Sequence, residues 1–238
     1  GVVRSTNKQF GIYLQDDWEV SDRLTLNLGL RWDYEKTPAW SDFVTGADVL
    51  TALATQDPQA GAPAGQTYAQ TLAAGGIDVA GFISTGSNRK AFKNAWQPRV
   101  GFSYDLSGDE RHVLFGGFGR AYDRNLFDYL QLERTKATFP YRQLAINSPG
   151  HACDVALAGC VDWSEQLLNR DYLLGLISSG DAGRQVWMFA NDLKVPYSDQ
   201  ISLGIRNQLM LAGQAWNTSL AYQFIDYNDG LLMQLGNR

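Results

Sequence analysis

Apolar and polar residues alternate along three pairs of segments in this chain. In the first pair, residues 10–20 and 24–34, apolar side chains occupy nearly all even positions, and most odd positions are polar or glycine. A period of two is the signature of a β-strand with one apolar and one polar face. Because only the short polar segment 21–23 separates the two runs, they predict a hairpin over residues 9–34.

The same alternation predicts two further hairpins, over residues 96–123 and 197–227. The return strand of the second hairpin is the least regular, because it contains Gly116, Gly117 and Gly119. Glycine inside a strand often marks a bend or a close approach of another backbone. We therefore keep this segment as a strand, in which the glycines mark a bend or a close approach.

Long segments without alternation connect the hairpins, whereas the turns within each hairpin are short. These connections span residues 36–95 and 124–196, and short helices are predicted in them at residues 47–55, 66–74 and 164–177. Connections of this length are usually functional or disordered. The strands therefore have short turns at one end and long loops at the other.

Strand length and aromatic placement distinguish this pattern from a soluble β-sandwich, which is the alternative. The predicted strands run roughly 11 residues, as a tilted membrane-crossing strand requires, whereas soluble strands usually have about 5–6. Outer-membrane barrels have aromatic girdles at both interfaces, short periplasmic turns and long extracellular loops. The predicted girdle residues are Trp18, Trp32, Tyr34, Trp96, Tyr104, Tyr122, Tyr197 and Trp216.

The pattern predicts an all-β fold in which residues 1–238 form part of one antiparallel transmembrane β-barrel domain. We expect an integral protein of the bacterial outer membrane that contacts outer-membrane lipid and exposes both long loops to the cell exterior. About six strands cannot close a membrane barrel, since the smallest single-chain barrels have about eight. We therefore expect the chain to be a segment of a larger barrel, the alternative being assembly with other pieces.

The composition narrows the range of partners. The chain has 20 basic and 25 acidic residues and a net charge of -5, which argues against a nucleic-acid partner. Hydrophobic residues make up 45% and charged residues 19%, which is typical of a folded protein. No apolar run approaches the length of about 18 residues that a membrane-spanning helix needs.

The two cysteines, Cys153 and Cys160, lie close together in the second long loop. In an exported protein, two cysteines in one exposed loop predict a local disulfide. The alternative is a metal site with His151, but these three residues are too few for a closed zinc site. We therefore expect no bound metal and no cofactor.

The sequence shows no catalytic constellation, because His112 and His151 lie in different elements and adjacent carboxylates are explained as solvated charges. We therefore expect no enzymatic activity. The alternation places Arg120 on the apolar face near the outer rim, where its side chain can reach lipid phosphates. The alternative is that Arg120 faces the lumen. We assign contact with the ligand or the plug to Asp33, Arg99, Asp123 and Gln200. The alternative is that these side chains only solvate the barrel wall or form ion pairs between strands.

The strand motifs together resemble a known family. Residues 11–18 (GIYLQDDW) and 24–33 (LTLNLGLRWD) are similar to a hairpin of TonB-dependent outer-membrane transporters. Residues 97–105 (QPRVGFSYD), 116–123 (GGFGRAYD) and 196–204 (PYSDQISLG) resemble later strands of these proteins, in the same order. The combination is most similar to the Oar-like subgroup. The resemblance covers the strands, and the long loops match no family.

This resemblance implies a barrel of about 22 strands that is closed by a plug domain of the same full-length chain. It implies active uptake of a ligand across the outer membrane of a Gram-negative bacterium, with extracellular loops and lumen wall binding the substrate. TonB would supply the energy through parts of the protein outside this sequence. The alternative is a surface or adhesion protein that uses the barrel as an anchor. The sequence does not identify the transported ligand.

Overall fold

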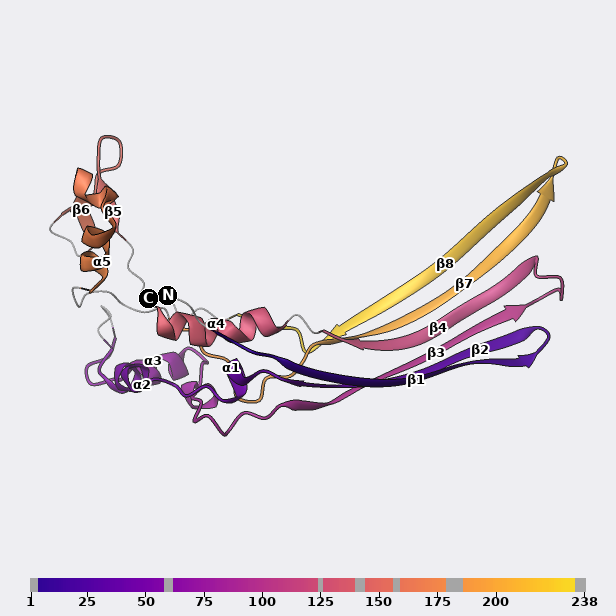
Figure 1. Cartoon of the computed structure of the whole chain (residues 1–238), viewed down its shortest axis with the longest axis horizontal. Coiled ribbons are helices and arrows are strands. Elements are labelled where there is room, and N and C mark those ends of the chain that lie inside the picture. The colour runs from indigo at the N-terminus through magenta and orange to yellow at the C-terminus, as the bar shows by residue number, and fades with distance from the viewer. Residues whose placement is uncertain are drawn as a thin grey trace.

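The main feature of the computed structural model is an antiparallel sheet of long strands, with helices gathered beyond one end of it (Figure 1). The structure describes residues 4–57, 62–123, 126–139, 144–155, 159–178 and 186–233. No helix among these residues is both long and apolar enough to cross a membrane.

Six strands make up the sheet, and each one pairs with its neighbours in sequence order. They form the hairpins β1–β2, β3–β4 and β7–β8, at the positions that the alternation predicted. The sheet is open, and β1 and β8 are its edges in the part of the chain that the structure describes. The strands are β1 (Lys8–Ser21), β2 (Leu24–Lys36), β3 (Phe92–Asp105), β4 (His112–Tyr122), β7 (Tyr197–Leu211) and β8 (Gln214–Asn228).

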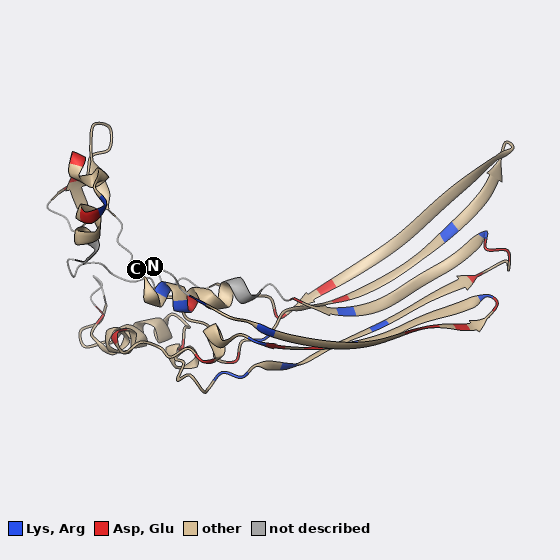
Figure 2. Ribbon diagram, in the orientation of Figure 1, with Lys and Arg blue, Asp and Glu red and all other residues tan. Residues whose placement is uncertain are grey.

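The register gives the sheet one apolar face and one polar face, because residues directly opposite each other share a face. One apolar row crosses five strands through Leu28, Val100, Phe118, Ile201 and Phe224. We call this side the apolar face and the other side the polar face. Charged residues lie mostly near the strand ends, with long uncharged stretches between them (Figure 2).

The glycines of β4 lie where neighbouring backbones approach closely. A Cβ atom at Gly117 would lie 2.8 Å from the carbonyl oxygen of Val100, and one at Gly116 would lie 2.7 Å from that of Ser202. No side chain fits at these distances without a shift of the adjacent strand. Of the two alternatives for these glycines, a bend or a close approach, the structure shows the close approach.

The first long connection contains α1 (Pro38–Ser41), α2 (Ala47–Ala54), α3 (Tyr68–Ala74) and the 3-10 turn η1 (Val79–Gly81). The helices predicted at 47–55 and 66–74 are present. Thr67 and Gln70 form a capping box that begins α3, since each side chain bonds the backbone N–H of the other residue. The loop is slightly shorter than predicted, because β2 continues to Lys36 and pairing with β3 already includes Phe92.

The second connection contains a long helix that the sequence pattern did not predict, α4 (Leu126–Thr138). The helix predicted at 164–177 is divided into a 3-10 turn and α5, because Asn169 caps a new helix by accepting hydrogen bonds from the N–H groups of Asp171 and Tyr172. The other elements are β5 (Ala145–Asn147), β6 (Cys160–Asp162), η2 (Glu165–Leu168) and α5 (Arg170–Ser178).

A small core joins the two connections at the end of the sheet. Trp40 of α1 and Leu130 of α4 are buried there, and Phe189, Leu193 and Val195 pack against them. We call residues 37–57, 62–91, 126–139 and 186–195 the cap. Residues 144–155 and 159–178, which carry the disulfide, form a separate module that stands away from the cap (Figure 1).

Candidate functional site

Arg89 is the buried centre of the cap, and its guanidinium binds parts of both long connections. Its Nη1 donates to Glu133 Oε2 at 2.5 Å and to the Trp40 carbonyl at 3.2 Å. Its Nη2 donates to Glu133 Oε1 at 3.0 Å and to the Phe189 carbonyl at 2.7 Å, and its Nε donates to Asn191 Oδ1 at 2.9 Å. A buried cation requires such complete pairing, so this residue fixes the cap as one unit.

Glu133 supplies the negative charge from α4, and its side chain is only 1% exposed. Burial raises the pKa of its carboxyl group, while hydrogen bonds from Arg89 and from the Phe189 amide oppose that rise. The paired geometry is bidentate, which fixes the orientation of both side chains as well as their separation. The ion pair therefore fixes the position of α4 against the first connection.

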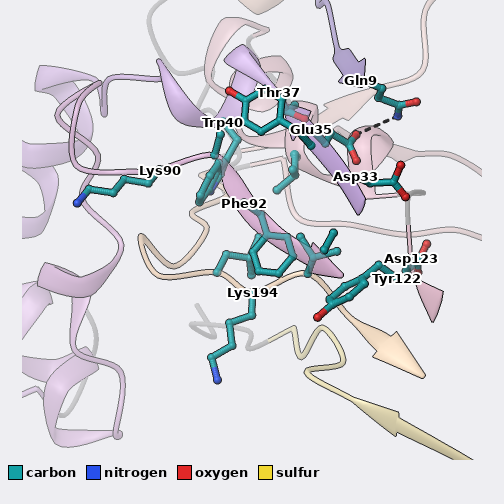
Figure 3. A pocket seen from close by; sticks show the side chains of 16 residues that line it. Gln9, Asp33, Glu35, Thr37, Trp40, Lys90, Phe92, Tyr122, Asp123 and Lys194 are labelled. Carbon is teal, nitrogen blue, oxygen red and sulfur yellow. Dashed lines mark hydrogen bonds between the residues drawn. The ribbon is translucent and has the colours of Figure 1, made fainter. Parts of the chain in front are cut away.

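A pocket lies between the cap and the end of the sheet (Figure 3). Its volume is about 60 Å³, enough for a small chemical group. The walls combine apolar side chains with a few polar groups, which is the usual composition of a ligand site. The strands contribute Gln9, Asp33, Tyr34, Glu35, Phe92, Ala95 and Tyr122, and the cap contributes Thr37, Trp40, Lys90, Ala91, Leu130, Leu193, Lys194 and Val195, with Asp123 at the end of β4.

Asp33 is a fixed carboxylate at the edge of this pocket and is only 6% exposed. Arg31 Nε donates to Asp33 Oδ2 at 2.9 Å, and Gln97 Nε2 donates to the same oxygen. Its Oδ1 occupies the space that a side chain at Gly11 would fill on the neighbouring strand. The polar face of the sheet therefore holds this carboxylate in one position.

Trp40 is a nearly buried wall of the same pocket. The residue is 6% exposed, and its Nε1 is buried with no hydrogen-bond partner among the residues that the structure describes. The guanidinium carbon of Arg89 lies 5.6 Å from the centre of its ring, which holds the indole in place. Trp40 therefore gives the pocket a fixed aromatic wall, which suits an apolar group of a ligand.

The structure brings together two of the four residues assigned to ligand or plug contact. Asp33 and Asp123 both line the pocket. Arg99 and Gln200 lie outside it on the polar face, on either side of Gly119 in the register. Ligand or plug contact stays a prediction for all four residues.

The eight predicted girdle residues all fall on the apolar face by register. At the cap end, the Trp32 ring centre lies 6.1 Å from those of Phe10 and Trp96 and 6.4 Å from that of Tyr34. Tyr34 and Tyr122 also line the pocket, a position that the sequence did not predict. The eight are Trp18, Trp32, Tyr34, Trp96, Tyr104, Tyr122, Tyr197 and Trp216.

Arg120 also lies on the apolar face, so the alternative that places it in the lumen is wrong. Its Nε and Nη2 each donate to a carboxylate oxygen of Asp199 at 2.7 Å. Its guanidinium carbon lies 4.3 Å from the centre of the Tyr197 ring. The charge is therefore neutralised by the residue directly opposite on β7.

The predicted disulfide between Cys153 and Cys160 is present, with 6.0 Å between the two Cα atoms. It closes the loop beside the short parallel pair β5–β6, in which Ala145 lies opposite Cys160. Within the described ranges, no group of three or more His, Cys, Asp or Glu side chains is placed to hold a metal ion.

A family model described as an outer membrane beta barrel domain matches residues 2–222 of the chain. This chain belongs to the outer membrane beta barrel domain family. Among solved structures it is similar to the alcaligin outer-membrane receptor FauA of Bordetella pertussis, with 12% sequence identity and a TM-score of 0.27. That match covers 97% of this chain and 32% of FauA, so the chain spans about a third of the receptor. No curated protein matches it.

Membership of this family places the protein in the outer membrane and gives the two faces of the sheet their roles. An outer-membrane barrel turns its apolar face to lipid and its polar face to the interior. The apolar face is therefore the lipid face, and the polar row through Arg99 and Gln200 belongs to the barrel interior. The antiparallel membrane fold predicted from the alternation is thereby confirmed.

Proposed function

We propose that this protein takes up a ligand actively across the bacterial outer membrane with energy supplied through TonB. Membership of the outer-membrane barrel family supports the location. The strand motifs, which resemble those of Oar-like TonB-dependent transporters, support the energy source. The proposal includes a barrel of about 22 strands, a plug domain of the same full-length chain, and TonB contact through parts outside this sequence.

The observation that carries this proposal is the pocket between the cap and the end of the sheet. Two loops that served only to cover an anchor would not need to share a buried ion pair. Nor would they need to form, against the strands, a pocket with apolar walls and a few polar groups. Here Arg89 and Glu133 lock the loops together, and Asp33 reaches the cavity from the interior face of the barrel. We therefore assign ligand capture to the extracellular cap and passage to the barrel interior.

The residues of the pocket suggest how capture proceeds. The Trp40 ring packs against the apolar part of the ligand, and the side chains of Leu130, Leu193 and Val195 cover it. The fixed Asp33 carboxylate accepts a hydrogen bond from the side of the ligand that faces the interior. Binding and release are sufficient for this role, and we propose no catalytic step.

The proposal is tested by comparing wild-type cells with a deletion of this gene and a deletion of TonB. Consumption of extracellular compounds from a complex medium is measured by mass spectrometry. We expect at least one compound whose uptake is lost in both deletions and restored by the wild-type gene. Normal uptake in the gene deletion, together with loss of attachment to surfaces, would contradict the proposal and favour the adhesion alternative.

A further inference from the structure

Two lysines face each other at the cap end of the first hairpin, on the lipid face. The register of β1 and β2 places Lys8 directly opposite Lys36, beyond the last aromatic pair. From the middle of the strands toward the cap, the successive pairs on this face are Leu14–Leu30, Ile12–Trp32, Phe10–Tyr34 and Lys8–Lys36. The sequence of layers is therefore aliphatic, then aromatic, then cationic.

This arrangement is unfavourable unless an anion is present, because like charges directly opposite each other destabilise a pair of strands. Lys36 has one acidic neighbour, Asp42, at 3.6 Å, with both side chains largely exposed, and such surface contacts contribute little. Lys8 makes no salt bridge within the described part of the chain. The adjacent Glu35 lies on the polar face, where its carboxylate accepts hydrogen bonds from the side chains of Asn7 and Gln9.

A third lysine, Lys93, lies on β3 at the register shift opposite Asp33–Glu35 of β2. Lys93 is exposed, and its carbonyl oxygen accepts a hydrogen bond from Trp32 Nε1 at 2.7 Å. That bond ties the start of β3 to the aromatic cluster of Phe10, Trp32, Tyr34 and Trp96. The cationic group is thus placed where the aromatic belt of a membrane protein meets the headgroups.

The other cation near this rim of the lipid face is neutralised by the protein itself. Arg120 has a bidentate partner in Asp199, so it needs no external anion. The lysine pair has no such partner opposite it in the register. The same face therefore carries one cation with a bidentate partner and a lysine pair whose ion pair, Lys36 with Asp42, is long and solvent-exposed.

We propose that Lys8, Lys36 and Lys93 form a binding site for the phosphate group of a lipid in the leaflet at the cap end. The ammonium groups bind the phosphate, and the aromatic cluster packs against the lipid below its headgroup. Lysine stems can lie along apolar rings while their charged ends reach the headgroup layer. This site rests on the membrane location of the barrel and is independent of the proposed uptake.

The test uses the native protein, purified from outer membranes in mild detergent, and native mass spectrometry of bound lipid. The probes are phosphatidic acid and diacylglycerol with identical acyl chains, which differ only in the phosphate. We expect wild type to prefer phosphatidic acid. The variant Lys8→Gln/Lys36→Gln should weaken that binding by roughly thirtyfold and leave diacylglycerol binding unchanged, since each lysine near a lipid surface contributes several-fold in affinity.

Two further variants make the result interpretable. Lys8→Arg/Lys36→Arg keeps both charges and should retain phosphatidic acid, which shows that loss in the glutamine variant is not misfolding. Arg134→Gln/Lys136→Gln removes the same charge from α4, away from the lipid face, and should bind like wild type. Equal binding by wild type and the lysine-to-glutamine variant, or equal loss in the α4 control, would overturn the site. Complete displacement by millimolar inorganic phosphate would overturn its assignment to a lipid.

Discussion

At the scale of single residues, Arg89 is the position where one change should have the largest effect on the cap. Replacing it with Leu leaves the Glu133 carboxylate buried without a partner. Breaking a buried ion pair from one side lowers the free energy of unfolding by about 3–5 kcal/mol. We expect hydrogen exchange of the α4 amides to accelerate accordingly, while exchange in the central strands stays unchanged.

Two comparisons separate charge from packing at this position. Arg89→Leu combined with Glu133→Leu removes both buried charges and should be less destabilising than Arg89→Leu alone. Arg170→Leu breaks an exposed ion pair with Asp171, whose side chains are 83% and 88% exposed, and should have no measurable effect. A double variant as unstable as the single one would show that shape, not charge pairing, dominates.

Trp40→Phe separates ligand binding from stability. Phenylalanine keeps an aromatic ring against Arg89 and removes the buried N–H that has no partner among the described residues. Loss of an unsatisfied donor does not lower stability. A ligand in the pocket would lose part of its apolar contact, because the phenylalanine ring is smaller than the indole. We expect unchanged thermal stability and a roughly threefold to tenfold rise in the KM of uptake. Unchanged KM would remove Trp40 from the proposed contact.

Local residue pairs were predictable from the sequence, and distant ones were not. Cys153 and Cys160 lie seven positions apart in one loop, so their bond was predictable from this proximity together with the expected export of the protein. Arg89 and Glu133 are 44 positions apart, and neither belongs to an alternating segment that sets its face. The pairing of Arg120 with Asp199 could have been predicted, because Asp199 lies on the same face of β7 as the apolar Ile201.

At the scale of elements, the strands were predictable because a period of two over many residues has no other explanation. Helix α4 was missed because its buried side carries Glu133 beside Leu130, which interrupts the apolar stripe that identifies an amphipathic helix. The pocket was missed for a related reason. Trp40, Leu130 and Leu193 converge from three segments whose packing depends on Arg89.

The disulfide module should respond to reduction independently of the sheet. The bond joins residues seven positions apart, so its loss should lower the stability of the module by about 2–3 kcal/mol in the chain-entropy description. Limited proteolysis within residues 145–178 should become faster with reductant, while the strands stay protected. Cys153→Ser/Cys160→Ser should be cleaved rapidly whether or not reductant is present. Equal loosening of the strands would contradict a separate module.

At the scale of the whole molecule, the open sheet exposes the backbone of β1 and β8 along its two edges. Unpaired backbone N–H and C=O groups are not tolerated in the hydrocarbon region. A closed barrel therefore needs further strands beside both edges, and the proposed larger barrel supplies them. The long contact between β7 and β8 and the apolar rows across the sheet already have the form of a barrel wall.

Tryptophan fluorescence can test how the sheet sits in the membrane. Trp18 and Trp216 are 54% and 56% exposed on the lipid face at the turn end, whereas Trp40 is buried in the cap. In bilayers that contain brominated lipids, we expect strong quenching in variants that retain only Trp18 or only Trp216. A variant that retains only Trp40 should be quenched little. Comparable quenching of all three would contradict the assignment of the lipid face.

The wide sequence spacing of the Arg89 contacts determines when the cap can form during biogenesis. Its partners lie 44, 49, 100 and 102 positions away, so they belong to segments on both sides of the second hairpin. Closing such long loops costs entropy that is recovered only when the last partner arrives. The cap therefore becomes stable only after the chain as far as Asn191 is in place. Resistance of the cap to protease then indicates that assembly has passed this point.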